Sequence, residues 1–391
     1  MKKMRLYTPG PVMIPEDTML AMARPIDHHR TSEFRQMHEE LSGLLKYLFQ
    51  TKHTCLTFTG SGTSGAEAAI AGCLPEGHKA LVYRNGKFAE RWAKVCASYG
   101  ISHETVDIEW GNGVKAEDVE KRLSADSTID TVIVVHSETS TTAFSDVEAI
   151  AAVTRKHNAL LLVDGITAVG CLPVKMDQWG VDVYITGSQK ALMLPPGLAF
   201  VAAGPRALAA AASATAPRSY WSWSEQTRFN DEGFFPYTPA TGLLFGLDEA
   251  LTLLAQEGLP AVFARHARHA AAARAAVEAW DLECFAERAH ERSVAATTVL
   301  LPAGHSADAL RSVILERCDM SIGGGLGRLA DRVIRIGHLG DFNDVMLLGT
   351  LGGVELGLRV AGIPHRPGGA QAALALLADT APHGVDSTAL G

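Results

Sequence analysis

Short apolar runs alternate with helix-type segments along the first half of the chain, and this alternation restricts the fold more than any other feature. We interpret seven stretches as strands, at residues 55–59, 80–83, 101–106, 131–136, 160–163, 183–186 and 199–202, and all of them except 101–106 are mainly apolar. Stretches with apolar residues at helical spacing separate most of these runs. Strands that alternate with helices predict an α/β fold with a mostly parallel, seven-stranded sheet that is covered on both faces.

The rest of the chain predicts a second, smaller α+β domain. At 391 residues the chain is long enough for two hydrophobic cores. We expect four units in order: an N-terminal segment (1–30), a large domain (31–255), a small C-terminal domain (256–365) and a tail rich in Pro, Gly and Ala (366–391). Prolines keep the first unit irregular, and the tail is expected to hold one short helix over residues 370–377.

Composition and charge exclude several classes of partner. The net charge of −8 and the absence of a basic run argue against nucleic acid and against a membrane surface. No transmembrane span or secretory signal is evident, and the six scattered cysteines show no metal-type pairing. We therefore expect a cytoplasmic protein with reduced, buried thiols and no metal site. The basic group at residues 265–269 is interpreted as the solvated face of a helix.

An aspartate and a lysine follow two of the predicted strands. Asp164 ends the apolar run 160–163, and Lys190 follows 26 residues later, directly after Gly187-Ser188-Gln189. Ligands of such sheets bind at the carboxyl ends of the strands, so we expect both side chains at one edge. A lysine amine can form a Schiff base with the aldehyde of pyridoxal 5′-phosphate, and a carboxylate can keep its ring nitrogen protonated. The pair therefore indicates a pyridoxal phosphate site.

A glycine-rich loop at residues 60–65 joins a predicted strand to a predicted helix. Backbone N–H groups in such a loop can approach an anion, and the helix N-terminus adds positive potential. The loop matches neither the Walker pattern nor the dinucleotide-binding pattern. A phosphate site and a tight structural turn both remain open for this loop on its own.

Several stretches in fixed order carry a resemblance to a known family. They are Tyr7-Thr8-Pro9-Gly10-Pro11, Gly60-Ser61-Gly62-Thr63, Asn85-Gly86-Lys87-Phe88, His136-Ser137-Glu138-Thr139-Ser140-Thr141, Gly187-Ser188-Gln189-Lys190-Ala191-Leu192, Ile322-Gly323-Gly324-Gly325-Leu326-Gly327 and Arg335-Ile336-Gly337-His338-Leu339-Gly340. Together with Asp164 they resemble the class V aminotransferases, which are fold-type I pyridoxal phosphate enzymes. The alanine/serine–glyoxylate aminotransferase branch is the most similar, and the likeness extends from Tyr7 to about Pro364.

The resemblance implies a role for each matching position around the cofactor ring. Lys190 would form the Schiff base and, once freed, would act as the base that moves a proton between substrate and cofactor. Asp164 would pair with the ring nitrogen, and Phe88 would stack on the ring where many relatives have Trp. Thr139 would orient the ring, and Gln189 would bond to the ring or the phosphate.

The resemblance also implies a phosphate cup that two subunits share. Ser61, Gly62 and Thr63 would cradle the phosphate from one subunit. Thr238 of the neighbouring subunit would complete the cup, although Phe235 stands where the family often has Tyr. A shared site implies a homodimer, and the N-terminal segment would reach both the site and the dimer interface.

Substrate binding is implied for two positions. Arg335 would bind the substrate carboxylate through a two-pronged ion pair, and the backbone near Gly10 would supply a second contact. His28, His29 and His338 are candidate walls of the substrate pocket, with a structural role equally open for each.

The predicted reaction is a ping-pong transfer of an amino group from a small amino acid, with alanine or serine favoured, to a 2-oxo acid, with glyoxylate preferred over pyruvate. An unusual donor, such as aspartate or an ureido or phosphonate amine, stays open. The alternative is a lyase or cysteine desulfurase of the same fold, which would need a reactive thiol on a mobile loop; Cys318 comes nearest. A cofactor-free relative is disfavoured because Lys190 and Asp164 are both present.

Overall fold

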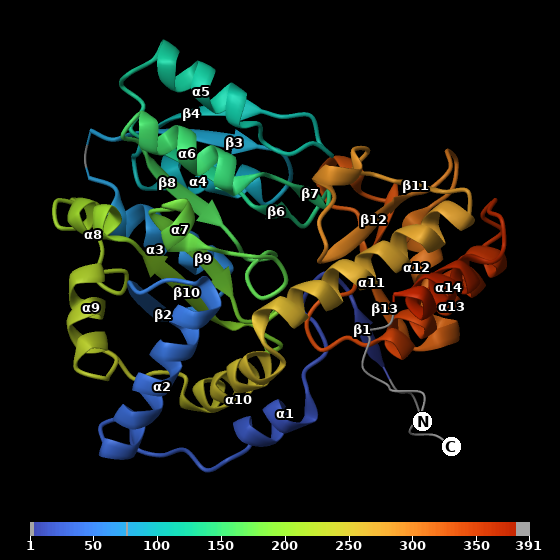
Figure 1. Ribbon diagram of the computed structural model, residues 1–391, viewed down its shortest axis with the longest axis horizontal. Helices are drawn as coiled ribbons and strands as arrows, with labels where there is room; N and C mark the ends of the chain where they lie inside the picture. The colour runs from blue at the N-terminus through green and yellow to red at the C-terminus, as the bar shows by residue number, and fades with distance from the viewer. Residues whose placement is uncertain (1–3, 76, 381–391) are drawn as a thin grey trace.

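The computed structural model describes residues 4–75 and 77–380, and it contains two main sheets with helices around them (Figure 1). The larger sheet has seven strands in the order β2-β10-β9-β8-β5-β3-β4. Their bounds are Thr54–Gly60 (β2), Lys79–Arg84 (β3), Ser102–Asp107 (β4), Thr131–Val135 (β5), Leu160–Asp164 (β8), Val183–Gly187 (β9) and Gly197–Ala203 (β10). β10 is antiparallel to both of its neighbours, and the other pairings are parallel. The predicted mostly parallel, seven-stranded sheet is therefore confirmed.

Helices cover both faces of this sheet, and its central strands β5, β8 and β9 are buried at every position. In β8, Leu161 and Val163 pack into one core cluster, whereas Leu160 and Leu162 pack into the other. The helices on the first face are α2 (Ser32–Phe49), α5 (Ala116–Ala125), α6 (Val147–Lys156), α7 (Met176–Trp179) and α10 (Thr241–Glu257). Those on the second face are α3 (Gly62–Cys73), α4 (Ala89–Ser98), α8 (Pro205–Ala211) and α9 (Trp223–Asp231). Successive side chains of a strand point to opposite faces, so both clusters grow from the same strands.

The smaller sheet has five strands in the order β1-β13-β14-β12-β11. Their bounds are Arg5–Tyr7 (β1), Glu283–Cys284 (β11), Ala296–Leu300 (β12), Met320–Gly324 (β13) and Val333–Gly337 (β14). Its helices are α11 (Leu259–Ala279), α12 (Ala307–Cys318), α13 (Asp344–Val360) and α14 (Gly369–Asp379), and two 3₁₀ turns, η1 (Ala289–Glu291) and η2 (Gly327–Leu329), lie in its loops. Helix α1 (Glu16–Met22) and a short hairpin of β6 (Ser137–Glu138) and β7 (Ala143–Phe144) complete the described structure. Figure 1 shows α11 starting near α10 and running across the small sheet.

The N-terminal segment differs from the irregular chain that the sequence predicted. Strand β1 joins the edge of the smaller sheet, parallel to β13, with Arg5 opposite Met320 and Tyr7 opposite Ile322. Tyr7 is buried there and meets Phe342 edge-to-face, with ring centroids 5.6 Å apart. This segment therefore connects the small sheet to the large one.

The predicted tail also has structure in its described part. Helix α14 covers the short helix that the sequence predicted over residues 370–377, and its Ala373 and Leu377 are buried in the small-sheet core. Residues 1–3 of the predicted N-terminal segment and 381–391 of the predicted tail lie outside the described residues. Among the residues that the structure does describe, no helix is both long and apolar enough to cross a bilayer.

The prediction of a solvated helix face at residues 265–269 is wrong. His266 and His269 of α11 are fully buried. The ring of His266 accepts the backbone N–H of Gly340 at 3.1 Å, and Arg265 donates to the carbonyl of Gly340 at 2.9 Å. His269 is held against Asp344 at the start of α13, 2.9 Å away. This group therefore fixes α11 to the loop that follows β14.

Candidate active site

A cavity of about 270 Å³ lies beside the carboxyl ends of β8 and β9. Nine of the residues to which the sequence assigned site roles line it together, namely Gly10, Ser61, Gly62, Thr63, Phe88, Thr139, Asp164, Gln189 and Lys190. The strand ends therefore bring these side chains to one edge of the sheet, as expected for an α/β fold. The lining residues lie at the ends of β2, β3, β5, β8 and β9 or in the connections that follow them, and Gly10 comes from the N-terminal segment.

Lys190 lies in the connection between β9 and β10, and hydrogen bonds of Ser188 stabilise this connection. The Ser188 hydroxyl donates to the carbonyl of Pro195 at 2.7 Å and accepts the N–H of Leu198 at 3.2 Å. Lys190 is only 7% exposed, and burial is the main cause that lowers its pKa to about 8, with the positive charge of Arg335 adding to the effect. Its amine therefore reaches the neutral form nearer to physiological pH than an exposed lysine does.

The N-terminal segment contacts this lysine directly. The Lys190 amine donates to the carbonyl of Pro9 at 2.5 Å. The next residue, Gly10, has a φ of +123°, and a Cβ atom there would lie 2.4 Å from Cδ of Lys190. Only glycine combines this backbone conformation with such a close approach. Gly10 therefore lies at the site for a steric reason, and its contact with the substrate carboxylate stays a prediction.

Asp164 ends β8 and is held by two donors. Its Oδ2 accepts the indole N–H of Trp92 at 3.0 Å, and its Oδ1 accepts the backbone N–H of Ile166 at 3.0 Å. Burial raises the pKa of Asp164, while these hydrogen bonds and the nearby Arg91 and Lys190 oppose the rise. A cationic ligand group beside this carboxylate would be strongly favoured.

Helix α3 begins at the cavity, at the glycine-rich loop. Ser61 is the N-cap residue, so the first N–H groups of the 12-residue helix open toward this region. A Cβ atom at Gly62 would lie 2.3 Å from Cδ1 of Ile166, which explains the glycine. Arg91 reaches the loop from α4 and donates to the Thr63 hydroxyl at 2.5 Å. A helix N-terminus with an adjacent guanidinium suits a phosphate.

Phe88 and Thr139 form two walls of the cavity. The Phe88 ring centroid lies 6.0 Å from Nζ of Lys190 and 5.3 Å from the guanidinium of Arg91. The Thr139 hydroxyl is 2.5 Å from that of Thr167, which fixes its rotamer. The cavity therefore has one aromatic wall and one polar wall.

Arg335 lies on β14 of the small sheet and reaches toward the large one. Its Nε donates to the carbonyl of Gly324 at 2.7 Å, and its Nη1 donates to the carbonyl of Thr139 at 3.0 Å. These bonds use two of the five guanidinium donors. Burial is the main cause that lowers the pKa of Arg335, to about 10, so the side chain still carries its charge near neutrality.

The donor set fits pyridoxal phosphate. The cavity offers an amine of lowered pKa, a buried carboxylate, an aromatic face and a helix N-terminus. In addition, Oε1 of Gln189 is buried and has no hydrogen-bond partner among the described residues. A buried polar atom of this kind normally has a partner, which a bound ligand would supply. These groups match the aldehyde, ring nitrogen, ring face and phosphate of the cofactor.

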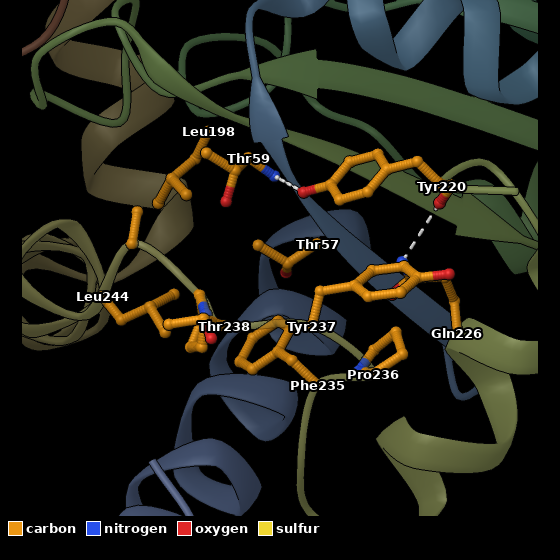
Figure 2. Close-up of a pocket in the computed structure, with 12 residues that line it drawn as sticks. Thr57, Thr59, Leu198, Tyr220, Gln226, Phe235, Pro236, Tyr237, Thr238 and Leu244 are labelled. Atoms are coloured by element: carbon orange, nitrogen blue, oxygen red, sulfur yellow. Dashed lines mark hydrogen bonds between the residues drawn. The ribbon is translucent and has the colours of Figure 1, made fainter. Parts of the chain in front are cut away.

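The loop that carries Thr238 forms a different pocket in the single chain. Figure 2 shows Thr238, Phe235 and Tyr237 around it with Tyr220, and this pocket shares no lining residue with the Lys190 cavity. The Tyr220 hydroxyl accepts the N–H of Thr59 at 3.1 Å, and its ring stacks on Tyr237 with centroids 5.4 Å apart. Contact of Thr238 with a phosphate stays a prediction.

The remaining candidates lie away from the cavity. His338 is fully buried, and its ring is 2.9 Å from the hydroxyl of Thr297 inside the small sheet. His28 and His29 lie together on the surface, with ring centroids 5.2 Å apart, and neither lines the cavity. Cys318 ends α12, and burial raises the pKa of its thiol. A desulfurase would need a readily ionised thiol, so Cys318 gives that alternative no support.

Three residues around the cavity were not singled out from the sequence. Arg91 and Trp92 lie on α4, three and four residues after Phe88, and such spacing places side chains on one face of a helix. Glu138 belongs to the stretch 136–141, but sequence reasoning gave a role only to its neighbour Thr139. The helical spacing could have identified the first two residues.

Comparisons with known proteins agree with this geometry. Residues 18–325 match the family described as aminotransferase class-V. The chain is 40% identical to the L-aspartate–glyoxylate aminotransferase of Paracoccus denitrificans, over 94% of each chain. It is 39% identical to the serine–glyoxylate aminotransferase of Methylorubrum extorquens, also over 94% of each. The crystal structure of ureidoglycine–glyoxylate aminotransferase from Bacillus subtilis superimposes with a TM-score of 0.92 at 28% identity, covering 97% of this chain and 99% of that one.

Proposed function

Since the chain belongs to the class-V aminotransferase family and is therefore a pyridoxal-phosphate-dependent aminotransferase, we propose that it moves the amino group of serine or alanine to glyoxylate. The serine–glyoxylate relative supports the choice of donor and acceptor. L-Aspartate is the second candidate donor, because the relative from Paracoccus denitrificans, 40% identical to this chain, is named for it.

One observation carries this proposal, namely that the buried side chains of Lys190 and Asp164 line the same cavity. When bound, pyridoxal phosphate supplies an aldehyde that takes up amino groups and a ring that accepts electrons. The Lys190 amine would hold the aldehyde carbon and, when released, would carry a proton at Nζ to and from the substrate. The carboxylate of Asp164 would hold the ring-nitrogen proton.

The other cavity residues would hold and orient the ligands. The first N–H groups of α3, together with Ser61 and Thr63, would bind the phosphate. Phe88 would stack on the ring, and the Thr139 hydroxyl and the Gln189 amide would bond to the cofactor. Arg335 would bind the substrate carboxylate, with its guanidinium oriented by the two bonds to carbonyls, and the backbone near Gly10 would supply a second contact. Gly10 leaves room for the lysine.

We also propose a cytoplasmic homodimer in which the two subunits share their sites. Leu20 and Ile26 of the N-terminal segment are 68% and 73% exposed in the single chain. Apolar side chains with this exposure are expected where a partner subunit covers them. Thr238 would reach the phosphate of the partner's cofactor. The six free thiols support a reducing compartment.

A spectral titration of the purified holoenzyme tests the proposed reaction. We expect serine or alanine to convert the visible cofactor band to the amine form, and glyoxylate to restore it. Aspartate and pyruvate are tested in parallel, and Lys190→Ala is the control that should show no conversion. A donor that converts the band without an oxo acid restoring it would contradict transamination. Restoration by pyruvate and not by glyoxylate would overturn the proposed acceptor.

A further inference from the structure

Glu138 is a fully buried carboxylate that accepts four hydrogen bonds beside the cavity. Its Oε2 accepts the backbone N–H of Phe88 at 3.1 Å and that of Ala89 at 2.9 Å. Its Oε1 accepts the N–H of Ser140 at 2.9 Å and the Ser140 hydroxyl at 2.7 Å. All four partners are donors, and an ionised carboxylate is the form that only accepts.

No cation forms an ion pair with Glu138 within the described ranges, so three backbone N–H groups and the Ser140 hydroxyl stabilise its charge. Phe88 and Ala89 are the N-cap and first residue of α4, where unpaired N–H groups and the helix dipole favour an anion. Burial raises the pKa of Glu138, and its bonds from Ser140 and Ala89 oppose that rise. The carboxylate thus accepts the hydrogen bonds of N–H groups at a buried helix end, which water would accept at an exposed one.

This carboxylate connects two different walls of the cavity. One pair of donors belongs to the turn that carries Phe88, and the other belongs to Ser140, next to Thr139. The Ser140 hydroxyl also accepts the N–H of Lys87 at 2.9 Å, which joins the two turns a second time. A Cβ atom at Gly86 would lie 2.2 Å from Cγ of Glu138, so the side chain is packed directly against the first turn.

We propose that Glu138 is a positioning residue that sets the spacing between the Phe88 wall and the Thr139 wall of the cofactor site. This inference rests on the proposed function, in which Phe88 and Thr139 contact the ring. The effect reaches the substrate side as well, because the carbonyl of Thr139 accepts from Arg335. Glu138 therefore acts on cofactor affinity first and on carboxylate binding second.

The direct test is Glu138→Gln in the full chain. A glutamine side chain has one acceptor oxygen, and its NH₂ group would face one of the two donor pairs, leaving those donors unpaired. We expect the apparent Kd for pyridoxal phosphate to rise about 10- to 100-fold, the visible circular dichroism of the bound cofactor to change, and KM to rise more than kcat falls. The readouts are titration of the apoprotein with pyridoxal phosphate and circular dichroism.

Glu291→Gln is the matched control. Glu291 is 3% exposed, accepts the N–H of Gly113 at 2.7 Å and pairs with Lys115, so it is also a buried carboxylate that holds a loop. It does not line the cavity. We expect this variant to lower the unfolding temperature of the apoprotein without changing the Kd for pyridoxal phosphate or the circular dichroism of the bound cofactor.

A second variant keeps the test decisive if Glu138→Gln does not fold. Ser140→Ala retains the carboxylate and removes one donor to it together with the acceptor for Lys87. We expect the Kd for pyridoxal phosphate to rise about 3- to 10-fold. A folded Glu138→Gln with wild-type Kd and circular dichroism, or a Ser140→Ala with wild-type Kd, overturns the inference. Failure of the wild-type protein to bind pyridoxal phosphate or to transaminate would instead overturn the proposed function.

Discussion

The indole N–H of Trp92 donates to Oδ2 of Asp164 across 3.0 Å, and both side chains are almost inaccessible to water. Because the N–H of Ile166 holds the other oxygen, the carboxylate is fixed from two sides before any ligand arrives. Trp92 comes from α4 and Asp164 from β8, so a helix of one face and a strand of the sheet together orient this group. A preorganised charge costs no reorganisation when it acts on a ligand.

The first prediction concerns this carboxylate. Asp164→Asn keeps the shape and removes the charge, so kcat should fall at least about 100-fold. Asp182→Asn is the control, since Asp182 is also buried, accepts the N–H of Leu161 at 2.9 Å and lies just before β9, at the opposite end of that strand from the cavity. We expect the control to lower thermal stability and leave kcat within about 3-fold. Similar kcat losses in both variants would contradict the role of Asp164.

The second prediction is a pH dependence of cofactor capture by the apoprotein. Below a pKa of about 8 the Lys190 amine is protonated and cannot attack an aldehyde, and above it the amine is free. The rate of capture should therefore rise with pH through about 8 and then level off, which stopped-flow absorbance can follow. Lys190→Ala should show no capture at any pH. An inflection near 10.5, the ordinary value for lysine, would contradict the effect of burial.

The third prediction concerns carboxylate binding. Arg335→Ala should raise KM for both the amino acid and the oxo acid about 100-fold, because a charge-assisted, two-pronged contact is lost. It should also move the Lys190 inflection to higher pH, because the charge of Arg335 lowers the pKa of Lys190. Arg206→Ala is the control, since Arg206 likewise donates to backbone carbonyls, those of Asn158 and Ala159. An unchanged KM in Arg335→Ala would mean that other groups hold the carboxylate.

The fourth prediction tests whether two subunits share each site. Thr238→Glu places a negative charge where a phosphate is proposed, so this variant should bind pyridoxal phosphate poorly and have low activity. Lys190→Ala should be inactive for a different reason. Mixed dimers of the two variants contain one site with both native residues if Thr238 acts across the interface, and the purified mixed dimer should then have up to about half of the wild-type activity. No recovery in a purified mixed dimer would mean that Thr238 acts within its own subunit.

The large sheet could be predicted from the sequence because most of its strands are short, mainly apolar runs; the edge strand β4, Ser102–Asp107, is the exception. Leu160–Asp164 is the best example, since the strand lies between two layers of helices and every position is buried. Lys190 and Asp164 then lie at one edge because parallel strands share a direction. The grouping of the site residues could therefore be predicted from the ends of the strands more than from any single motif.

Long-range contacts explain what could not be predicted. β1 has only three residues, too few for a periodic pattern, and it is a strand because Met320–Gly324 pairs with it. His266 and His269 were misassigned because their helix is rich in alanine, which gives little contrast between its faces. Their burial depends on Gly340 and Asp344, which lie some 75 residues later in the chain.

Strand β1 also sets an order of events during synthesis. The large sheet is formed by residues 54–203, so its strands can pair while the ribosome is still elongating the chain. Arg5, by contrast, can pair with Met320 only after residue 320 has been made. At typical rates of translation this delay is on the order of 15 to 60 s. The segment that contacts Lys190 is thus among the first residues made and among the last to be fixed. The surroundings of this lysine are therefore complete only after the chain has been made as far as residue 320.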